Sequence, residues 1–255
     1  MEYQSPDDTV MVSQLPTSDW RDEQWGLGFG LYVNTLVYAY LMLYGEHESA
    51  GQLRELMNRM EVLGRAKNPH EHEGLVVPSK PYYALYSYKV LNSDRFDLLG
   101  NSLAILTGIA SPDRAGNMVA WIEAECEAMR NRGDLAVDSP PCLFPYILRH
   151  DPDWHPRYEQ YNRPGEYHNG GVWPFVCGFH VAACVAAGNI GLARRKLLAL
   201  TELGQAVARK RGGVGLQRVD SGANRSAQRT GLADLVGGHV PLRSGVCTAA
   251  ANPVL

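Results

Sequence analysis

Apolar residues recur at helical spacing along most of this chain, and this periodicity restricts it to a largely helical architecture. Such runs lie over 27–44, 49–63, 101–109, 111–130, 173–187 and 190–210. One further segment, 82–90, alternates tyrosine and leucine with small residues and is compatible with a pair of strands. The pattern predicts an all-α protein built of paired helices with elaborated loops.

Two of these helices begin at residues that favour an N-cap. Ser49 precedes the second run, which Gly64 would stop, and Ser111 is followed by Pro112 at the first helical position. The first run should end near Gly45, because glycine adopts the left-handed conformation that closes helices.

The composition is that of a globular chain without a nucleic-acid or membrane partner. Hydrophobic residues make up 45% and the net charge is −3, with no Lys/Arg-rich run. No apolar stretch is long enough to span a bilayer, and the first twenty residues lack the pattern of a signal peptide. A cytoplasmic location is therefore expected.

The cysteines and histidines predict neither disulfides nor a metal centre. The five cysteines are Cys126, Cys142, Cys177, Cys184 and Cys247, an odd number without a Cys-x-x-Cys pair. Cys177 and Cys184 are expected on the buried face of one helix. His70 and His72 have no partner ligands at zinc spacing, so they are expected in a solvated turn, and no cofactor is predicted.

Residues 166–175 combine an imidazole, an amide, a Gly-Gly pair and an indole just before an apolar run. Such a stretch can form a sugar-binding loop, in which a ring stacks on a pyranose and polar groups bind hydroxyls. Gly170 and Gly171 allow a tight turn or a close approach of the backbone. The alternative is an ordinary loop whose aromatic residues pack on the core. The connection that ends here, 139–171, is long enough to favour a functional role.

Three motifs resemble one family. Residues 167–174, Tyr-His-Asn-Gly-Gly-Val-Trp-Pro, resemble the Tyr-His-Asn-Gly-Gly-x-Trp-Pro signature of the neutral/alkaline invertases, glycoside hydrolase family 100. Bacterial amylo-α-1,6-glucosidase-like proteins have a related loop. Residues 95–105 resemble the family's Leu-Gly-Asn-x-x-Ala-Ile segment, and Asp-Trp-Arg-Asp-Glu at 19–23 is a third match. The three motifs occur in the same order as in the family, and together they span most of residues 19–200.

The resemblance implies an (α/α)6 barrel of the six-hairpin glycosidase type that hydrolyses an α-glycosidic bond with inversion. Inversion needs a carboxylic acid and a carboxylate base about 6.5–9.5 Å apart, so that a water molecule fits between them. By position, Asp22 matches the family's general acid. Without the resemblance, Asp22 would be read as a surface carboxylate paired with Arg21.

The resemblance also implies a set of residues that bind a carbohydrate substrate. His168 and Asn169 would bind hydroxyls, and Trp20 and Trp173 would stack on sugar rings. A helix-capping role is an equal alternative for Asp97. The full predicted binding set is Trp20, Arg21, Asp97, Tyr167, His168, Asn169 and Trp173.

The chain departs from the family at both ends. Asp22 lies well inside the family's sequence but near the start here, so the leading helices are expected to be missing and 1–211 to form a partial toroid. Near the other end, no aromatic residue follows Phe179 and no glutamate follows Glu202. The family's general base, a glutamate beside aromatic residues, is absent from the chain as written.

A shifted reading frame would explain the segment 212–255. When the last two bases of each codon are read with the first base of the next, the codons of Val214 to Val219 permit Trp-Gly-Phe-Asn-Glu-Trp. The codons of Thr230 to Val240 permit Gln-Asp-Trp-Gln-Thr-Trp and then an apolar run. We therefore expect a slip of one base between about 205 and 213 and a disordered tail after it. The alternative is a genuine flexible tail.

Three functional hypotheses remain. The first is a fragment of an inverting α-glycosidase, either invertase-like or debranching-like. The second is a carbohydrate-binding pseudoenzyme that has lost its base; Glu166 is the nearest remaining carboxylate to the loop, but it does not match the position of the family's base. The third is an inactive product of a broken reading frame.

Resequencing the source DNA from the codon of Leu200 through the stop tests the frame slip. We expect one extra or missing base whose correction restores Trp-Gly-Phe-Asn-Glu-Trp. An intact frame with codon choices that forbid this motif would show that the tail is genuine.

Overall fold

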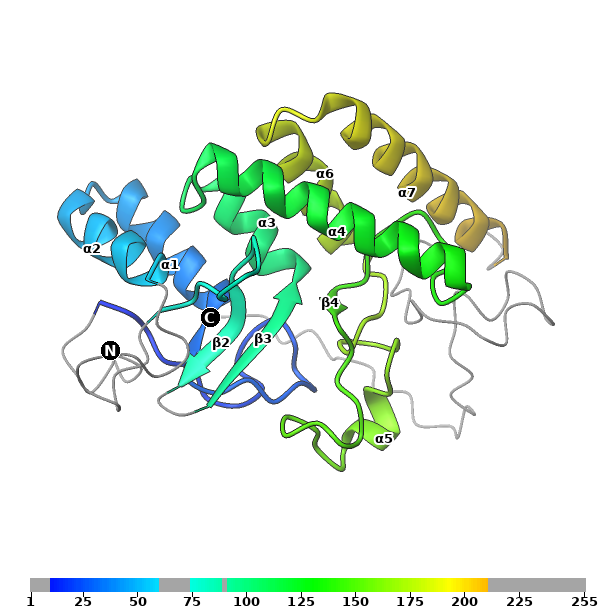
Figure 1. Cartoon of the computed structure of the whole chain (residues 1–255), viewed down its shortest axis with the longest axis horizontal. Helices are drawn as coiled ribbons and strands as arrows, with labels where there is room; N and C mark the ends of the chain where they lie inside the picture. The colour runs from blue at the N-terminus through cyan, green and yellow to red at the C-terminus, as the bar shows by residue number, and fades with distance from the viewer. Residues whose placement is uncertain (1–9, 60–73, 89–90, 211–255) are drawn as a thin grey trace, which may run out of the picture.

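The computed structural model describes residues 10–59, 74–88 and 91–210, and helices dominate these residues (Figure 1). The helices are α1 (Leu31–Leu43), α2 (His47–Met57), α3 (Leu98–Leu106), α4 (Pro112–Arg132), α5 (Tyr158–Tyr161), α6 (Pro174–Ala186) and α7 (Ile190–Lys210). The strands are β1 (Phe29–Gly30), β2 (Ala84–Tyr88), β3 (Leu91–Asp97) and β4 (Leu143–Phe144). The predicted segment 212–255 lies outside the described residues, as do Gly64, His70, His72 and Cys247.

The long helices form three consecutive pairs, α1 with α2, α3 with α4, and α6 with α7 (Figure 1). The first helix of each pair also contacts the first helix of the next, because α3 packs against both α1 and α6. A row of helical hairpins joined through their first helices is the arrangement that an α/α toroid repeats. The helix-rich fold confirms the predicted fold class and is compatible with a partial toroid, to which a small sheet is added.

Two of the four helix ends predicted from capping residues are found close to those residues, whereas α2 ends at Met57, before Gly64. The Ser111 hydroxyl accepts a hydrogen bond from the Arg114 N–H at 3.3 Å and caps α4, with Pro112 at its first position. Gly45 follows α1 with a φ of 79°. The prediction of Ser49 as an N-cap is wrong: α2 begins at His47, because the turn after α1 is only three residues long.

The four strands form one antiparallel sheet in the order β1-β2-β3-β4. The strand pair expected around 82–90 exists as the β2–β3 hairpin, although its second strand runs on to Asp97. Since α3 follows β3 directly and β4 begins the path to residues 166–175, this sheet connects the helical pairs to the candidate loop.

The Leu-Gly-Asn motif joins α3 to its neighbours. The Asn101 side chain accepts from the Tyr83 N–H at 2.9 Å and donates to the Tyr83 carbonyl at 3.1 Å, which ties α3 to the chain entering β2. A Cβ at Gly100 would lie 2.9 Å from the Cγ of Leu31. Glycine is therefore required there by the close approach of α1 and α3.

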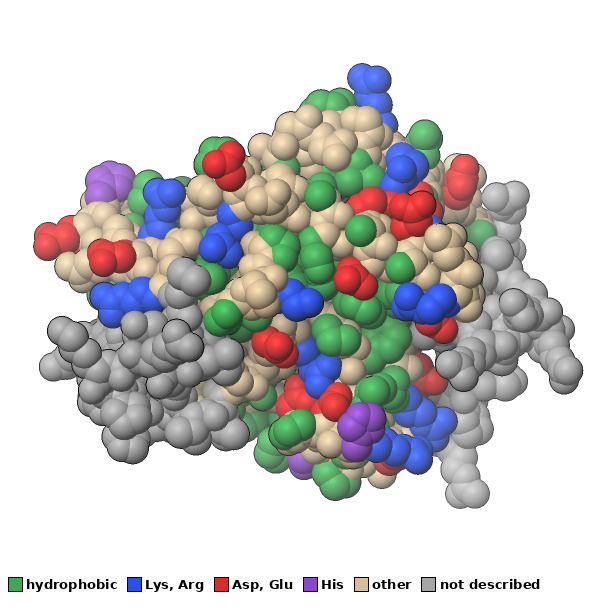
Figure 2. Space-filling view, viewed as in Figure 1, with side chains coloured by type: hydrophobic (Ala, Val, Ile, Leu, Met, Phe, Trp, Pro, Cys, Tyr) green, Lys and Arg blue, Asp and Glu red, His purple; other side chains and the backbone are tan. Residues whose placement is uncertain are grey.

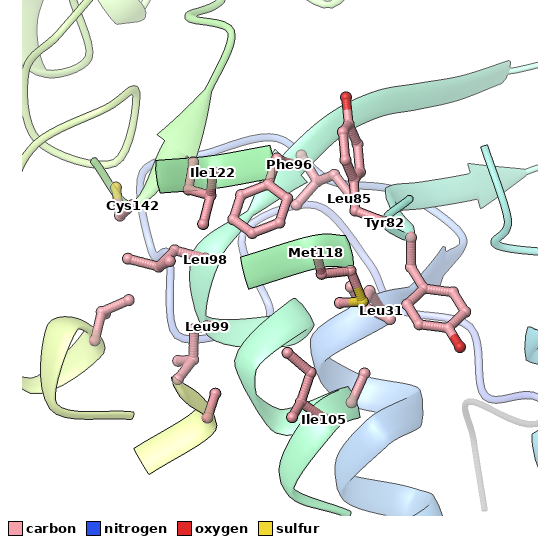
Figure 3. Packing of buried hydrophobic residues seen from close by; sticks show 14 of the residues in the cluster. Leu31, Tyr82, Leu85, Phe96, Leu98, Leu99, Ile105, Met118, Ile122 and Cys142 are labelled. Atoms are coloured by element: carbon pink, nitrogen blue, oxygen red, sulfur yellow. The ribbon is translucent and has the colours of Figure 1, made fainter. Parts of the chain in front are cut away.

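The core lies between the sheet and the helices α1, α3 and α4 (Figure 3). Tyr82 packs edge-on against Phe96 at 5.2 Å between ring centroids and lies 4.4 Å from the Trp121 ring. The labelled residues of this cluster are Leu31, Tyr82, Leu85, Phe96, Leu98, Leu99, Ile105, Met118, Ile122 and Cys142. Burial of this apolar area supplies most of the stability of such a fold.

A buried lysine ties α7 to α4. The Lys196 ammonium is 2% exposed and lies 2.6 Å from carboxylate oxygens of both Glu123 and Asp138. Arg130 of α4 pairs with the same two carboxylates. A buried ammonium is tolerated only with such partners, so the network fixes where α7 docks.

Cys177 and Cys184 lie on the buried face of α6, which confirms their predicted packing role. The opposite face of this helix is apolar and exposed: Phe175 is 47%, Phe179 41% and Val185 48% accessible. On the face shown in Figure 2, hydrophobic side chains gather below α4, over the strands, and charged side chains surround them. No helix in the described part of the chain is long and apolar enough to cross a membrane.

The buried His180 predicts a pH-dependent stability. Burial, with a smaller contribution from Lys196, lowers the pKa of His180 to about 4. The folded protein therefore keeps this imidazole neutral while the unfolded chain protonates it near pH 6.5, so stability present above that pH is lost as the pH falls toward 4. We expect the unfolding free energy to drop by about 2 kcal/mol between pH 7.5 and 5 from this group alone.

Urea denaturation across that pH range measures this loss. His180→Gln should have a flatter profile than the parent chain, and His47→Gln, which removes an exposed histidine, is the control. Parallel profiles for the parent and His180→Gln would contradict the assignment.

Candidate active site

The long connection 139–171 is held against β3 by Arg95. Its guanidinium binds the carboxylates of Asp151 at 2.7 Å and Asp153 at 2.8 Å. It also donates to the carbonyls of Pro145 at 3.0 Å and Tyr146 at 2.8 Å. One planar donor group thus binds this connection at four residues. The sequence 166–175 is thereby brought back to the body of the fold.

The Gly-Gly turn of the loop is as tight as its sequence predicts. The Gly171 N–H donates to the Tyr167 carbonyl at 2.9 Å, and a Cβ at Gly171 would lie 2.4 Å from that oxygen. Gly170 has a φ of 108°, and a Cβ there would lie 2.2 Å from the ring of Tyr146. Gly170 therefore requires glycine for its backbone conformation and for space, and Gly171 requires it for space.

Asn169 is buried, and its amide holds the loop in place. The side chain accepts from the Ile147 N–H at 2.6 Å and donates to the carbonyls of Ile147 at 2.8 Å and Asn162 at 2.9 Å. With these three hydrogen bonds, the Asn169 amide group is occupied by backbone partners within the protein. In this conformation Asn169 shapes the loop, and its predicted binding of a sugar hydroxyl stays a prediction.

His168 lies at the centre of an aromatic cluster. Its ring stacks on Trp173 at 5.1 Å between centroids and meets the edge of Trp20 at 5.2 Å. The Trp173 indole N–H donates to the Tyr167 carbonyl at 2.9 Å. Trp173 is 5% exposed, so in this structure it packs the loop. Trp20 is partly exposed, which keeps a stacking role open to it.

Asp22 reaches the loop from a segment 145 residues away in the sequence. The Tyr167 hydroxyl donates to its Oδ1 at 3.1 Å, and the His168 Nδ1 lies 3.8 Å from the same oxygen. The carboxylate is nevertheless 65% exposed. The Asp22 carboxylate is thus bound by the loop and still open to solvent.

The alternative pairing of Asp22 with Arg21 is not found. Arg21 binds instead the carboxylates of Asp19 at 2.9 Å and Asp97 at 2.6 Å, and its side chain is 3% exposed. Burial disfavours the charged guanidinium, but the two carboxylates outweigh it and raise the pKa of Arg21. Burial raises the pKa of Asp97, against the attraction of Arg21. Arg21 thus anchors the segment, and its predicted contact with substrate stays a prediction.

Asp97 caps α3, which is one of the two roles that the sequence predicted for it. Its Oδ2 accepts the Gly100 N–H at 3.0 Å, while its Oδ1 binds Arg21. The side chain is fully buried, so the capping role is structural. Its alternative role, contact with a substrate, would require the site to open.

Two residues that no sequence motif marks, Asn162 and Tyr158, connect the segment around Asp22 to the long connection 139–171. Asn162 accepts the His168 N–H at 2.9 Å and donates to the Glu23 carbonyl at 2.5 Å. The Tyr158 hydroxyl accepts the Trp25 N–H at 2.8 Å. A single asparagine in a long connection carries no recognisable signal, because its partners are backbone groups brought together only by folding.

Comparisons with known proteins show that the segment containing the loop is similar to one family. A family model described as "Alkaline and neutral invertase" matches residues 88–206, which include Asp97 and the whole loop but not Asp22. This match confirms the resemblance to the neutral and alkaline invertases. The geometry above therefore describes, over that segment, how an invertase-like chain builds its Tyr-His-Asn-Gly-Gly-x-Trp-Pro loop.

Curated relatives agree with the family model. The chain is 30% identical over 103 residues to cytosolic invertase 1 of Oryza sativa, a match that covers 40% of this chain and 17% of the relative. It is 31% identical over 103 residues to the probable alkaline/neutral invertase D of Arabidopsis thaliana, covering 40% and 18%. Neutral/alkaline invertase 1, mitochondrial, of rice is 30% identical over 125 residues, covering 48% and 19%. The chain thus spans less than a fifth of these relatives.

Among the described residues, no group of three histidine, cysteine or acidic side chains is arranged to hold a metal ion. The four cysteines of that part of the chain are buried and free. At the loop, the Asp22 carboxylate, the Tyr167 hydroxyl and the His168 imidazole lie next to one another.

The Gly170 backbone yields a test of the loop geometry. Gly170→Ala should lower the unfolding free energy by about 3 kcal/mol, because it combines a positive φ with a clash against Tyr146. The matched control is Gly188→Ala: this glycine has a φ of 80° but no atom within 4 Å of a Cβ, and its replacement should cost only about 1 kcal/mol. Equal losses in urea denaturation would show that the Tyr146 contact is unimportant.

Proposed function

We propose that this chain is the acid-bearing part of an inverting α-glycosidase of invertase type, with Asp22 as the general acid. The observation that carries the proposal is the position of Asp22: an exposed carboxylate bound by the Tyr167 hydroxyl of the family's loop. The match of residues 88–206 to the alkaline and neutral invertases supports the reaction class.

In this mechanism Asp22 protonates the oxygen of the leaving group as the glycosidic bond breaks. The Tyr167 hydroxyl orients the carboxylate, and His168 lies beside it at 3.8 Å. A second carboxylate about 6.5–9.5 Å from Asp22 would activate water on the opposite face of the sugar. We assign that role to the glutamate that the shifted frame restores at the codons of Arg218 and Val219, which lie outside the described residues.

The relatives are named invertases, which favours a sucrose-like substrate over an α-glucan. Their names include both cytosolic and mitochondrial proteins, so the cytoplasmic location of this chain stays a prediction. Without the restored glutamate, the chain as written is expected to bind carbohydrate without hydrolysing it, because no glutamate follows Glu202.

Two versions of the protein test this function, the chain as written and the chain with its frame restored, each preceded by the leading helices of an invertase relative. Sucrose hydrolysis, followed as reducing sugar, should be absent in the first and present in the second. In the restored chain, Asp22→Asn should lower the rate by about 10²–10⁴-fold, the usual contribution of a general acid.

The control variant is Asp113→Asn, which makes the same chemical change at an exposed position at the start of α4 and should leave the rate unchanged. Hydrolysis by the chain as written would refute the need for the lost glutamate. A restored chain that retains full activity as Asp22→Asn would refute the assignment of the acid.

A further inference from the structure

Gln24 is buried beside the candidate site, and its amide group has no protein partner. The residue is 3% exposed, and neither Nε2 nor Oε1 makes a hydrogen bond within the part of the chain that the structure describes. The neighbouring Gln14 differs, because its Nε2 donates to the Asp19 carboxylate and to the Gly26 carbonyl, both at 3.3 Å. A buried amide is rarely left unpaired in a folded protein, since losing its hydrogen bonds to water is costly.

Gln24 is one of the residues that line a small cavity. Its walls include Asp19, Arg21 and Tyr86, and its volume is about 10 Å³. This space is close to the minimum that one water molecule occupies, and a sugar ring is far too large for it. The cavity therefore fits a single oxygen-sized group.

The charges around the cavity select a neutral occupant. Asp19 is a carboxylate that disfavours an anion, and Arg21 is a guanidinium that disfavours a cation. The Gln24 amide offers one acceptor oxygen and one donor nitrogen. A group that satisfies both must itself donate and accept, which describes a hydroxyl or a water molecule.

The cavity is coupled to the catalytic candidate through one turn of the backbone. The Gln24 N–H donates to the Arg21 carbonyl at 3.2 Å, which closes a turn over residues 21–24. Within this turn the Asp22 carboxylate is exposed, whereas Gln24 is buried and lines the cavity.

We propose that the Gln24 cavity binds one neutral, hydroxyl-sized group, which donates to Gln24 Oε1 and accepts from Gln24 Nε2. The group is either a hydroxyl of the bound carbohydrate or a water molecule, and only the first source rests on the proposed function. In the first case, Gln24 is a specificity residue beside the general acid.

Gln24→Leu and Gln24→Met both remove the amide. Methionine is unbranched like glutamine, so it serves as the second variant in case the branched leucine packs poorly. Gln52→Leu on α2 is the matched control, because this glutamine is exposed. For each protein, sucrose affinity is measured by calorimetry and stability by urea denaturation. A crystal structure of the parent chain, with and without sucrose, locates any oxygen within about 3.2 Å of both Gln24 amide atoms.

If a sugar hydroxyl occupies the cavity, the sucrose Kd should rise about tenfold or more in both Gln24 variants and stay constant in Gln52→Leu. If water occupies it, the Kd is unchanged, both variants are less stable and the crystal shows one ordered oxygen. A parent chain that binds no sucrose but shows this water would refute the proposed function alone. Unchanged affinity, higher stability in both variants and no ordered oxygen would overturn the proposal.

Discussion

The buried Arg21 is the constraint on which the candidate site depends. A guanidinium that is 3% exposed is stable only when carboxylates surround it, and Asp19 and Asp97 do so at 2.9 and 2.6 Å. Asp97 ends β3 and caps α3, so this ion pair fixes residues 19–22 to the junction of the sheet with the helical pairs. The exposed Asp22 is held next to the loop because Arg21 is held in the core.

The loop itself shows that a family motif can be structural in most of its residues. Gly170 is required by its positive φ, and both glycines are required by the atoms close to them. Asn169 binds backbone groups, and Trp173 packs against His168. Only the Tyr167 hydroxyl and the His168 ring lie beside the Asp22 carboxylate. The motif therefore builds a rigid platform, and few of its atoms are left to meet a ligand.

Much of the fold could be predicted because its signals are local. Helical periodicity, the Ser111-Pro112 start and the glycine after α1 depend on residues within a few positions of one another, and the structure contains these elements. Ser49 failed as a cap because the length of the preceding turn decided where α2 starts. Asn162 could not be recognised, because its role depends on a carbonyl 139 residues away. Gln24 could not be recognised either, because its cavity is lined by residues from separate segments of the chain.

The sequence by itself determined the helical pairs, the Gly-Gly turn, the resemblance to the invertases and the choice of Asp22 as the acid candidate. The tertiary structure decided which charged groups pair. Folding buries Arg21 between Asp19 and Asp97 and places the Asp22 carboxylate within hydrogen-bond distance of the Tyr167 hydroxyl. It also decided that Trp173 would be covered rather than open. The physical reason is that burial and partner choice are properties of distant segments packed together, whereas conformational preference belongs to neighbouring residues.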